Sequence, residues 1–558
     1  MTLATEDELY SNLLRGYGKT SDLLSGRAIH AKLIKGSLPV SLFLQNHLLN
    51  MYVKSGDLSG GLKVFEEMPE KNVVSWSAVI AGFVQNGCAE GALTLFSRMQ
   101  CEGTTQPNEF TLVSALQACS LSENVTLAHQ IYAFIVRLGF ESNIFLVNAF
   151  LTALVRHGKL AEALEVFENC PDKDIVTWNT MMGGYLQFSY EDIPGFWCWM
   201  NHEGIKPDNF TFSSVLTGLA ALCQLKMGVQ VHALLVKSGY GDEICVGNSL
   251  ADMYIKNQKL VEGFRAFDEM PQKDVCSWSQ MAAGCLLCGE PRKALVVIER
   301  MKKMGVKPNK FTLATALNAC ANLASLEEGK KFHGLRFKLG SEIDVCVDNA
   351  LLDMYAKCGC LDDVWGVFQL MKDRSVVSWT TMIMACAQNG QPKEALEIFD
   401  EMRQAGAEPN NITFICVLYA CSQGGFVDEG WKHFSSMTED FGISPGEDHY
   451  ACMVNLLGRA GLIKEAKELI LRMPFLPGPL IWQTLLGACQ IHGDVETGKF
   501  AAEQATQQDG KDPSTYVLLS NILAGLSNWE GVGTVRELME TRDVQKVPGS
   551  SWIEREKV

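Results

Sequence analysis

The sequence of 558 residues lacks several features that would assign it to a common class of protein. No apolar run reaches the ~18 residues of a membrane-spanning helix, so we expect a chain that does not cross a membrane. Alternating apolar and polar runs bounded by turn signals are missing, which argues against β-strands. No linker or low-complexity stretch divides the chain, although ordinary globular statistics would suggest roughly three or four domains.

A basic excess is missing as well. The chain has 48 Lys and Arg against 64 Asp and Glu, which gives a formal net charge of −16. Proteins that bind nucleic acid usually carry a basic surface that follows the phosphates. Any RNA binding by this chain would therefore depend on local basic residues and on contacts to the bases, because the overall charge opposes it.

A disulfide framework is not expected either. The 19 cysteines are odd in number and lie scattered through apolar segments. This distribution predicts reduced thiols, nearly all of them buried in the core as small apolar side chains.

The chain does contain an internal repeat. Trp76, Trp178, Trp278 and Trp379 stand in near-identical sequence words, separated by 102, 100 and 101 residues. A spacing kept so closely indicates a repeat array, which forms one elongated body in place of separate globular domains.

Each unit of this repeat divides into three helix–turn–helix hairpins. In the unit from Ile175, Gly204 and Pro207 stop the second helix of the first hairpin. Since each hairpin can bury its apolar stripe only against its neighbours, the pattern predicts an all-α solenoid. The predicted hairpins are 7–41, 42–72, 73–108, 109–143, 144–174, 175–208, 209–243, 244–274, 275–309, 310–344, 345–375, 376–410, 411–446, 447–479, and then, with different sequence words, 480–513 and 514–547.

These words resemble the pentatricopeptide repeat family of land plants, in the class with alternating P, L and S repeats. The resemblance rests on Ser-Trp-Ser at 75–77, Ile-His-Ala-Lys-Leu-Ile-Lys at 29–35 and the word at 349–359. It implies a right-handed superhelical solenoid with about 14 repeats over 7–479. Words such as Tyr-Val-Leu-Leu-Ser-Asn at 516–521 and Pro-Gly-Ser-Ser-Trp-Ile-Glu at 548–554 are similar to the family's C-terminal E motifs, which places an E extension of two hairpins at 480–554.

The resemblance implies a site-recognition factor for C-to-U editing of organelle transcripts, which binds single-stranded RNA. A zinc deaminase needs a His with a Glu two residues beyond it, and none of the ten histidines has one. Cys285 and Cys288 form a Cys-x-x-Cys word, but inside a predicted helix, where packing is the preferred interpretation over zinc. We therefore expect no catalytic residue, no metal and no cofactor, and a DYW-type deaminase, with or without other editing-complex proteins, recruited in trans.

The same resemblance favours a mitochondrial location, with the chloroplast as second choice. The segment 1–14 lacks the basic start and apolar core of a secretory signal. Its acidic residues Glu6, Asp7 and Glu8 are also unlike a typical organellar transit peptide, so no transit peptide is evident.

In the family, the fifth residue of a repeat reads one base together with the last residue of the repeat, while an apolar second residue wedges between bases. Val74, Val176 and Val377 fit the wedge, and Cys276 fits it less well. The L repeats carry Val113, Ser213, Ala314 and Ile415 at the fifth position and should read little. The predicted pairs and bases are Asn46 with Asn72 (a pyrimidine), Ser77 with Asn108 (A), Asn148 with Asp174 (U), Asn179 with Asp208 (U), Asn248 with Asp274 (U), Ser279 with Asn309 (A), Asn349 with Ser375 (C) and Thr380 with Asn410 (A).

Competing interpretations remain open at this point. A lone Asn or Ser near a helix start is more often a capping residue than a ligand. The tryptophans beside the reading positions, and the recurrent His30, His232 and His333, are better explained by packing. At the level of function, an organellar splicing or transcript-stability factor would use the same groove, and a protein-binding helical scaffold is a weaker alternative. An enzyme is the weakest, for want of any nucleophile–base or metal constellation.

Overall fold

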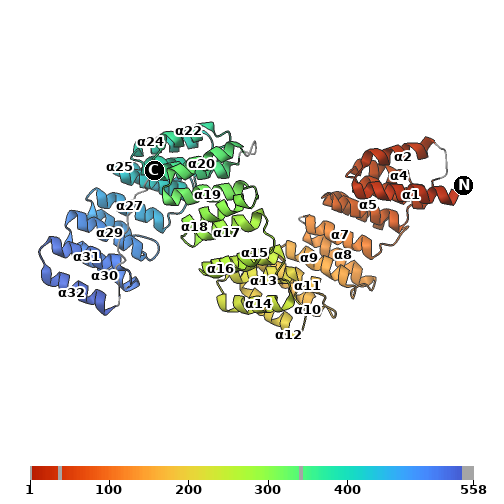
Figure 1. Cartoon of the computed structure of the whole chain (residues 1–558), viewed down its shortest axis with the longest axis horizontal. Helices are drawn as coiled ribbons and strands as arrows, with labels where there is room; N and C mark the ends of the chain where they lie inside the picture. Colours follow the sequence, from red (N-terminus) through yellow and green to blue (C-terminus); the bar gives the residue numbers. More distant parts are fainter. Residues whose placement is uncertain are drawn as a thin grey trace. The chain divides into compact units, whose positions relative to one another are not determined.

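The computed structural model describes residues 3–35, 40–122, 124–338, 344–509, 511–542 and 544. These residues form 32 α-helices and one short 3-10 helix, and no strand occurs among them, so the all-α prediction is confirmed. None of the helices in these ranges has the length and apolar character needed to cross a membrane. The chain forms two compact units, Met1–Lys273 and Asp274–Val558 (Figure 1).

In both units the helices form consecutive hairpins, with an odd-numbered first helix and an even-numbered second helix. The first unit contains α1 (Leu3–Thr20), α2 (Leu23–Lys35), α3 (Leu42–Lys54), α4 (Leu58–Glu67), α5 (Val73–Gln85), α6 (Ala89–Glu102), α7 (Glu109–Leu121), α8 (Val125–Arg137), α9 (Ile144–Arg156), α10 (Leu160–Asn169), α11 (Ile175–Phe188), the 3-10 turn Tyr190–Asp192, α12 (Ile193–His202), α13 (Asn209–Ala221), α14 (Leu225–Ser238), α15 (Ile244–Lys256) and α16 (Leu260–Glu269).

The second unit continues the alternation. It contains α17 (Val275–Leu287), α18 (Pro291–Lys303), α19 (Lys310–Leu323), α20 (Leu326–Lys338), α21 (Val345–Lys357), α22 (Leu361–Leu370), α23 (Val376–Gln388), α24 (Pro392–Gln404), α25 (Asn411–Gly424), α26 (Val427–Glu439), α27 (Glu447–Arg459), α28 (Ile463–Leu471), α29 (Pro479–His492), α30 (Val495–Gln508), α31 (Pro513–Gly525) and α32 (Trp529–Thr541).

The hairpin boundaries follow from capping residues. From Leu42 to Glu447, every first helix starts at the residue where the sequence places the start of a repeat. The residue before the helix commonly accepts a backbone hydrogen bond from its first turn, as Asp208 does from Thr211 N at 2.8 Å. The last two hairpins start at Pro479 and Pro513, one residue before the predicted starts, because proline suits the first helical position.

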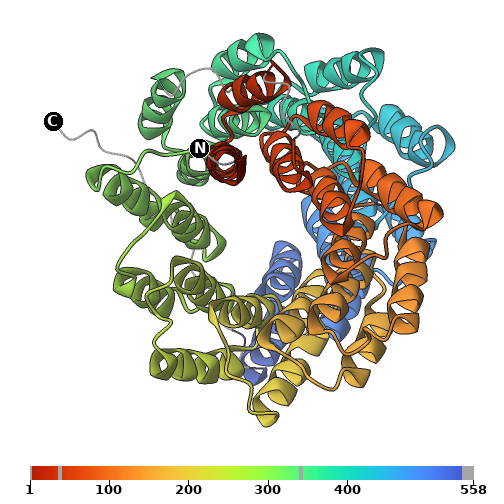
Figure 2. The same cartoon turned by 90° about the vertical axis from the view of Figure 1, so that its right-hand side faces the viewer.

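Within each unit the first helices pack against one another in series, as α5, α7 and α9 do. Each second helix packs on its own first helix and, in most hairpins, on the first helix that follows. No two second helices in the described ranges pack closely together. Figures 1 and 2 both show the consecutive hairpins of each unit side by side. The first helices therefore form a continuous layer, and one face of that layer is shared by all repeats of a unit.

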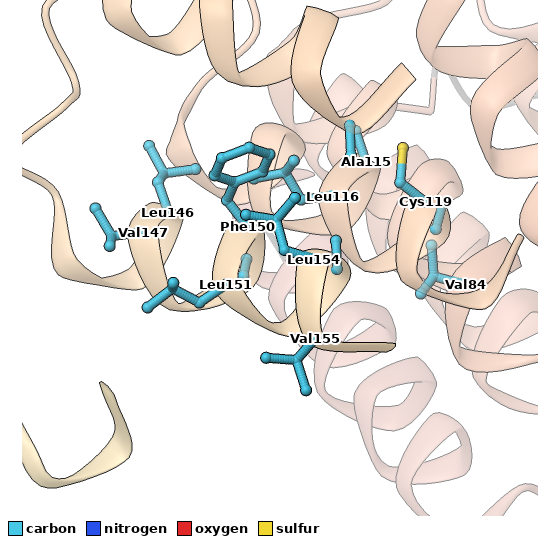
Figure 3. Packing of buried hydrophobic residues seen from close by; sticks show 14 of the residues in the cluster. Val84, Ala115, Leu116, Cys119, Leu146, Val147, Phe150, Leu151, Leu154 and Val155 are labelled. Carbon is cyan, nitrogen blue, oxygen red and sulfur yellow. The ribbon is translucent and has the colours of Figure 1, made fainter. Parts of the chain in front are cut away.

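The core lies between first and second helices and between neighbouring first helices. Figure 3 shows Leu116 of α7 against Phe150 and Leu154 of α9, all three buried. The prediction that the tryptophans pack in the hairpins is confirmed, since all four are at most 5% exposed. Three of them meet a phenylalanine in edge-to-face geometry, with ring centroids 4.7 Å apart for Phe65 and Trp76, 4.8 Å for Phe167 and Trp178 and 5.1 Å for Phe368 and Trp379.

The recurrent histidines also pack. Each lies on the second helix of an L repeat, half-buried, and its Nδ1 meets a tyrosine hydroxyl of the following S repeat. In the L repeat at 109–143, Tyr132 takes the histidine's place and stacks on Phe150, with ring centroids 4.0 Å apart. The pairs are His30 with Tyr52 at 2.9 Å, His232 with Tyr254 at 2.9 Å and His333 with Tyr355 at 2.8 Å.

The cysteine prediction is partly wrong. All 19 thiols are free, but only eight are buried and four are partly buried. Three of the exposed thiols, Cys245, Cys276 and Cys346, occupy the second position of a first helix, a position that faces outward in every repeat. The seven exposed cysteines are Cys88, Cys101, Cys198, Cys223, Cys245, Cys276 and Cys346.

Candidate nucleic-acid interface

The fifth residue of a first helix lies beside the residue that closes its repeat. Asn179 Nδ2 donates to both carboxylate oxygens of Asp208, at 3.0 and 3.1 Å. Asp208 also caps α13, and the hydroxyl of Thr211, three residues further on, donates to Asn179 Oδ1 at 2.7 Å. The helix cap therefore fixes the orientation of the Asn179 amide before any ligand is present.

The same three positions meet in other repeats of the first unit. Asn46, Asn148 and Ser77 all contact the capping residue that closes their repeat. The bonds are Asn46 Nδ2 to Asn72 Oδ1 at 3.4 Å, Ser75 Oγ to Asn46 Oδ1 at 2.7 Å, Ser77 Oγ to Asn108 Oδ1 at 3.2 Å, Ser77 Oγ with Thr111 Oγ1 at 2.6 Å and Asn148 Nδ2 to Asp174 Oδ1 at 3.2 Å.

In the second unit the fifth residues that carry a hydroxyl contact the third residue of the next first helix. Ser279 Oγ lies 2.6 Å from Thr312 Oγ1, and Thr380 Oγ1 lies 3.0 Å from Thr413 Oγ1. Both threonines belong to capping boxes whose N-cap residues are Asn309 and Asn410.

The two remaining pairs are placed as follows. Asn349 lies on α21, and Ser375, which closes its repeat, caps α23 and bonds to Ser378. Asn248 lies half-buried on α15 of the first unit. Asp274 is the first residue of the second unit and caps α17.

The two members of a pair differ in the part they take in the helix cap. All eight closing residues accept a backbone hydrogen bond at the start of the next first helix, so capping holds for them. The eight fifth residues lie inside their helices and cap nothing. Several of their side chains bond instead to the cap of the next first helix, and the hydroxyls of Ser77, Ser279 and Thr380 also donate to the backbone carbonyl four residues before them.

Two of these side chains have a buried atom that the protein leaves unsatisfied. Oδ1 of Asn148 and Oδ1 of Asn349 are buried, and no atom of the described residues hydrogen-bonds to either. A buried acceptor without a partner costs on the order of 1–3 kcal/mol. A donor from a bound ligand at the fifth position would remove that cost.

The carboxylate of Asp174 stays ionised at this site. Burial works against its charge, but hydrogen bonds from the backbone and hydroxyl of Thr177 and from Asn148 outweigh burial and lower the pKa of Asp174. An ionised carboxylate only accepts hydrogen bonds. It therefore holds the Asn148 amide with its NH₂ group toward the cap.

In each unit, exposed apolar residues form a row at the second position of the first helices. Val74, Val176 and Val377, the predicted wedges, are 50%, 52% and 57% exposed. The larger members of this row were not predicted from the sequence, although the repeat register places them at the same second position of the first helices. They are Phe43, Phe110, Phe145, Phe210, Phe311 and Ile412, all between 58% and 76% exposed.

A second feature missed from the sequence is a row of cations at the ends of the S-repeat first helices. Eleven residues separate the second and thirteenth positions of a helix, which is close to three full turns, so both lie on the same face. Asp252 pairs with Lys256 at 3.0 Å and Asp353 with Lys357 at 2.9 Å. The thirteenth residues of the five S repeats are all exposed cations: Lys54, Arg156, Lys256, Lys357 and Arg459.

A cavity of about 270 Å³ opens beside Thr380 in the second unit. Val377, Met384 and Ile412 give it apolar walls, and Thr380 and Asn410 give it a polar edge. Asp353, Thr381 and Gln388 also line it, so the cavity offers both apolar and hydrogen-bonding groups.

The Cys-x-x-Cys word lies at the C-terminal end of α17, with Cys285 in the helix and Cys288 as its C-cap. Burial raises the pKa of the Cys285 thiol to about 12, and Cys288 is only partly buried. The described residues contain no group of three or more His, Cys, Asp or Glu arranged to hold a metal ion. Among the L repeats, Ser213 is engaged with Ser249, their hydroxyl oxygens 2.7 Å apart.

Comparison with known families agrees with this geometry. The PPR repeat profile matches residues 46–73, 74–104, 145–175, 248–275, 276–306, 349–376 and 448–475. The PPR repeat family profile matches 173–221 and 374–423, and the E motif profile matches 492–554. A relative of Arabidopsis thaliana, the putative pentatricopeptide repeat-containing protein At3g15130, is 36% identical over 540 residues, which cover 95% of this chain and 78% of the relative. The chain belongs to the pentatricopeptide repeat family. The alternating repeat lengths and the E motif are those of its PLS class, E subgroup.

The relatives are longer than this chain, by different amounts. The Arabidopsis thaliana protein At4g33170 is 37% identical over 539 residues, covering 96% of this chain but 54% of the relative, so the chain spans about half of that protein. Among solved structures, the pentatricopeptide repeat protein PPR10 from maize superposes with a TM-score of 0.58 at 18% identity, covering 96% of this chain and 90% of PPR10. The solenoid of pentatricopeptide hairpins is thereby confirmed.

Proposed function

We propose that this pentatricopeptide repeat protein binds single-stranded RNA in a sequence-specific manner, one base per repeat. The observation that carries the proposal is the recurrent bond between a polar fifth residue and the cap that closes its repeat, beside an exposed apolar second residue. Unpaired bases expose both their faces and their Watson–Crick edges. The apolar row can stack on the faces while the pairs read the edges. A PPR10 structure at a TM-score of 0.58 contains an 18-nt psaJ RNA element, which supports the same use of this fold.

The pairs predict a target sequence. We propose that the array spans 7–479 and that the repeat from Leu42 meets the 5′ end of the site. The RNA then reads Y-A-n-U-U-n-U-A-n-C-A-n-n up to the repeat that starts at Glu447. An Asn amide carries both a donor and an acceptor, and its closing residue decides how it is turned.

We further propose that the RNA is an organelle transcript and that binding selects a cytidine for C-to-U editing, a few nucleotides downstream. The E motif at 492–554 supports this, and we assign the C-terminal extension at 480–554 the recruitment of a DYW-type deaminase in trans. Relatives named as chloroplastic and as mitochondrial both occur, at 35% and 34% identity, and support an organelle. We retain the mitochondrion as first choice.

Binding to defined RNAs tests the core of this proposal. The purified chain should bind a 13-nucleotide RNA of the predicted sequence more tightly than a scrambled RNA of equal composition. Equal affinity for the two would contradict base reading. The same protein, incubated alone with an RNA that extends past the site, should give no C-to-U conversion, and conversion without added protein would contradict recruitment in trans.

A splicing or transcript-stability factor is the second candidate, because it would use the same rows of residues. An enriched RNA whose predicted site lies next to an intron or a transcript end, with no edited cytidine downstream, would favour it over editing.

A further inference from the structure

The hairpin formed by α29 and α30 repeats the geometry of a base-reading repeat. Gln483 is the fifth residue of α29, and its Nε2 donates to Asp512 Oδ2 at 2.5 Å and to Thr515 Oγ1 at 3.2 Å. Asp512 closes the hairpin and caps α31 by accepting a hydrogen bond from Ser514 N. Thr515 is the third residue of α31 and is 1% exposed. These are the positions that Asn179, Asp208 and Thr211 occupy in the array.

The other positions of this hairpin agree as well. Leu480 is the second residue of α29 and is 56% exposed, like the apolar row of the array. Trp482 is the fourth residue and is 3% exposed, like the packing tryptophans of the P repeats. In the preceding hairpin the fifth residue is Ala451 and the closing residue is Gly478, which have no side-chain donor or acceptor. The arrangement of a polar fifth residue beside its cap therefore recurs after two repeats that lack it, those with Ile415 and Ala451 at the fifth position.

The matched family profiles leave this site unassigned. The last PPR repeat match ends at residue 475, and the E motif match begins at 492, so Gln483 lies in neither. We propose that 479–512 is a further base-reading repeat whose specificity is set by Gln483 and Asp512, and whose ligand is a uridine. This rests on the RNA binding proposed above.

The chemistry of the pair favours uracil. Asp512 accepts one amide hydrogen of Gln483, which leaves the Gln483 amide oxygen and the carboxylate as acceptors beside the base edge. Hydrogen bonds from Ser514 N and its hydroxyl and from Gln483 lower the pKa of Asp512 against the effect of burial, so it carries a charge. Uracil presents its N3–H donor to these acceptors, whereas cytosine presents a lone pair at N3.

The length of the side chain favours a pyrimidine. Gln483 is one methylene longer than the Asn at the fifth position of other repeats, so its amide extends further from the helix. Less room then remains for a base, and a single ring fits better than a purine. The repeat adds a fourteenth nucleotide, U, directly 3′ of the predicted string, and makes the first hairpin of the extension part of the RNA-binding surface.

Four RNAs that differ only at this fourteenth nucleotide test the inference with the unaltered full chain. The U form should bind about threefold to tenfold more tightly than the A, G and C forms, which is the range of one or two net hydrogen bonds. Gln483→Leu should reduce the affinities for all four RNAs to a common value. The matched control is Gln507→Leu, an exposed glutamine on α30, which should leave the preference intact.

The outcomes separate the two proposals. Equal affinity of the unaltered chain for all four RNAs, with the 13-nucleotide string still preferred over a scrambled RNA, would overturn this inference alone. Loss of the preference for the string itself would overturn the proposed function and this inference together. The comparison of bases needs no variant, so misfolding of Gln483→Leu would leave the test decisive.

Discussion

At Asn179 a single side chain makes three hydrogen bonds inside the protein, two to Asp208 and one from Thr211. A surface amide without such partners would rotate freely, so it could not present a fixed donor or acceptor to a ligand. Because Asp208 also caps α13, any change at the reading residue acts on an amide whose orientation is already fixed. In the proposed function, base selectivity depends on which donors and acceptors this fixed amide presents to the RNA.

We expect Asn179→Thr to shift the preference at one base from U toward a purine, because the shorter hydroxyl makes room and resembles Thr380 and Ser279. Binding to a panel of RNAs with single-base changes measures the shift. Asn201→Thr on α12, an exposed position on a second helix, is the control and should change nothing. An unchanged profile for Asn179→Thr would show that the register is wrong.

Elements are joined by packing and by a few buried polar contacts. On α21, Asp348 is 1% exposed and pairs with Arg336 of α20 at 2.5 Å. Burial raises the pKa of Asp348 in spite of Arg336, since a charge is costly away from water. The pair lies next to Asn349 and ties the L repeat to the S repeat that follows.

We expect Arg336→Met to lower the free energy of unfolding by about 2–3 kcal/mol, somewhat less than for a fully buried pair because Arg336 is partly exposed. The loss arises because a buried carboxylate is left without its partner. Thermal unfolding measures it. Lys331→Met on the same helix removes an exposed ion pair with Glu328 and should cost less than about 1 kcal/mol; equal losses for the two variants would argue against the buried pair.

Across the whole molecule, the proposed RNA binding has to coexist with an acidic net charge. The net charge is −16, yet exposed cations recur at the thirteenth position of the S repeats. Their face is the one that carries the apolar row and the reading pairs. In the proposed function a few locally placed cations, such as Arg156, bind phosphates that the overall charge repels.

We expect a weak salt dependence of RNA binding, set by these few cations. Arg156→Gln should reduce the slope of log affinity against log salt by about 0.7, the value for one phosphate contact in a single strand. It should weaken binding to all RNAs alike, because phosphates carry no sequence information. A change in base preference at constant slope would contradict a phosphate contact.

Stability should fall on mild acidification. Burial lowers the pKa values of His30, His232 and His333, so the unfolded chain takes up protons that the folded chain does not. Each histidine contributes stability above its ordinary pKa of about 6.5, and the contribution is lost as pH falls from there toward the folded pKa. Melting temperatures at pH 7.5 and 5.5 should differ less for a triple His→Phe variant than for the unaltered chain.

The sequence by itself determined the repeat length, the register of the hairpins and the packing of the tryptophans. These depend on short-range rules: a capping residue precedes each helix, and apolar residues recur at helical spacing. Both signals lie within a few neighbouring residues of the sequence. It did not show how exposed the phenylalanines Phe110 and Phe145 are, or that Cys245 and Cys346 face outward, since apolar residues on a helix are expected inside.

Only the tertiary structure decided which residues of neighbouring hairpins are in contact. The hydrogen bond between Asn179 and Asp208 joins residues 29 apart in sequence. Gln483 and Asp512 are likewise 29 apart and share the geometry in a region with different sequence words. Whether a polar side chain caps a helix, stays unsatisfied like Asn148 Oδ1 or turns toward a ligand depends on how the next hairpin stacks, and stacking is a property of the folded array.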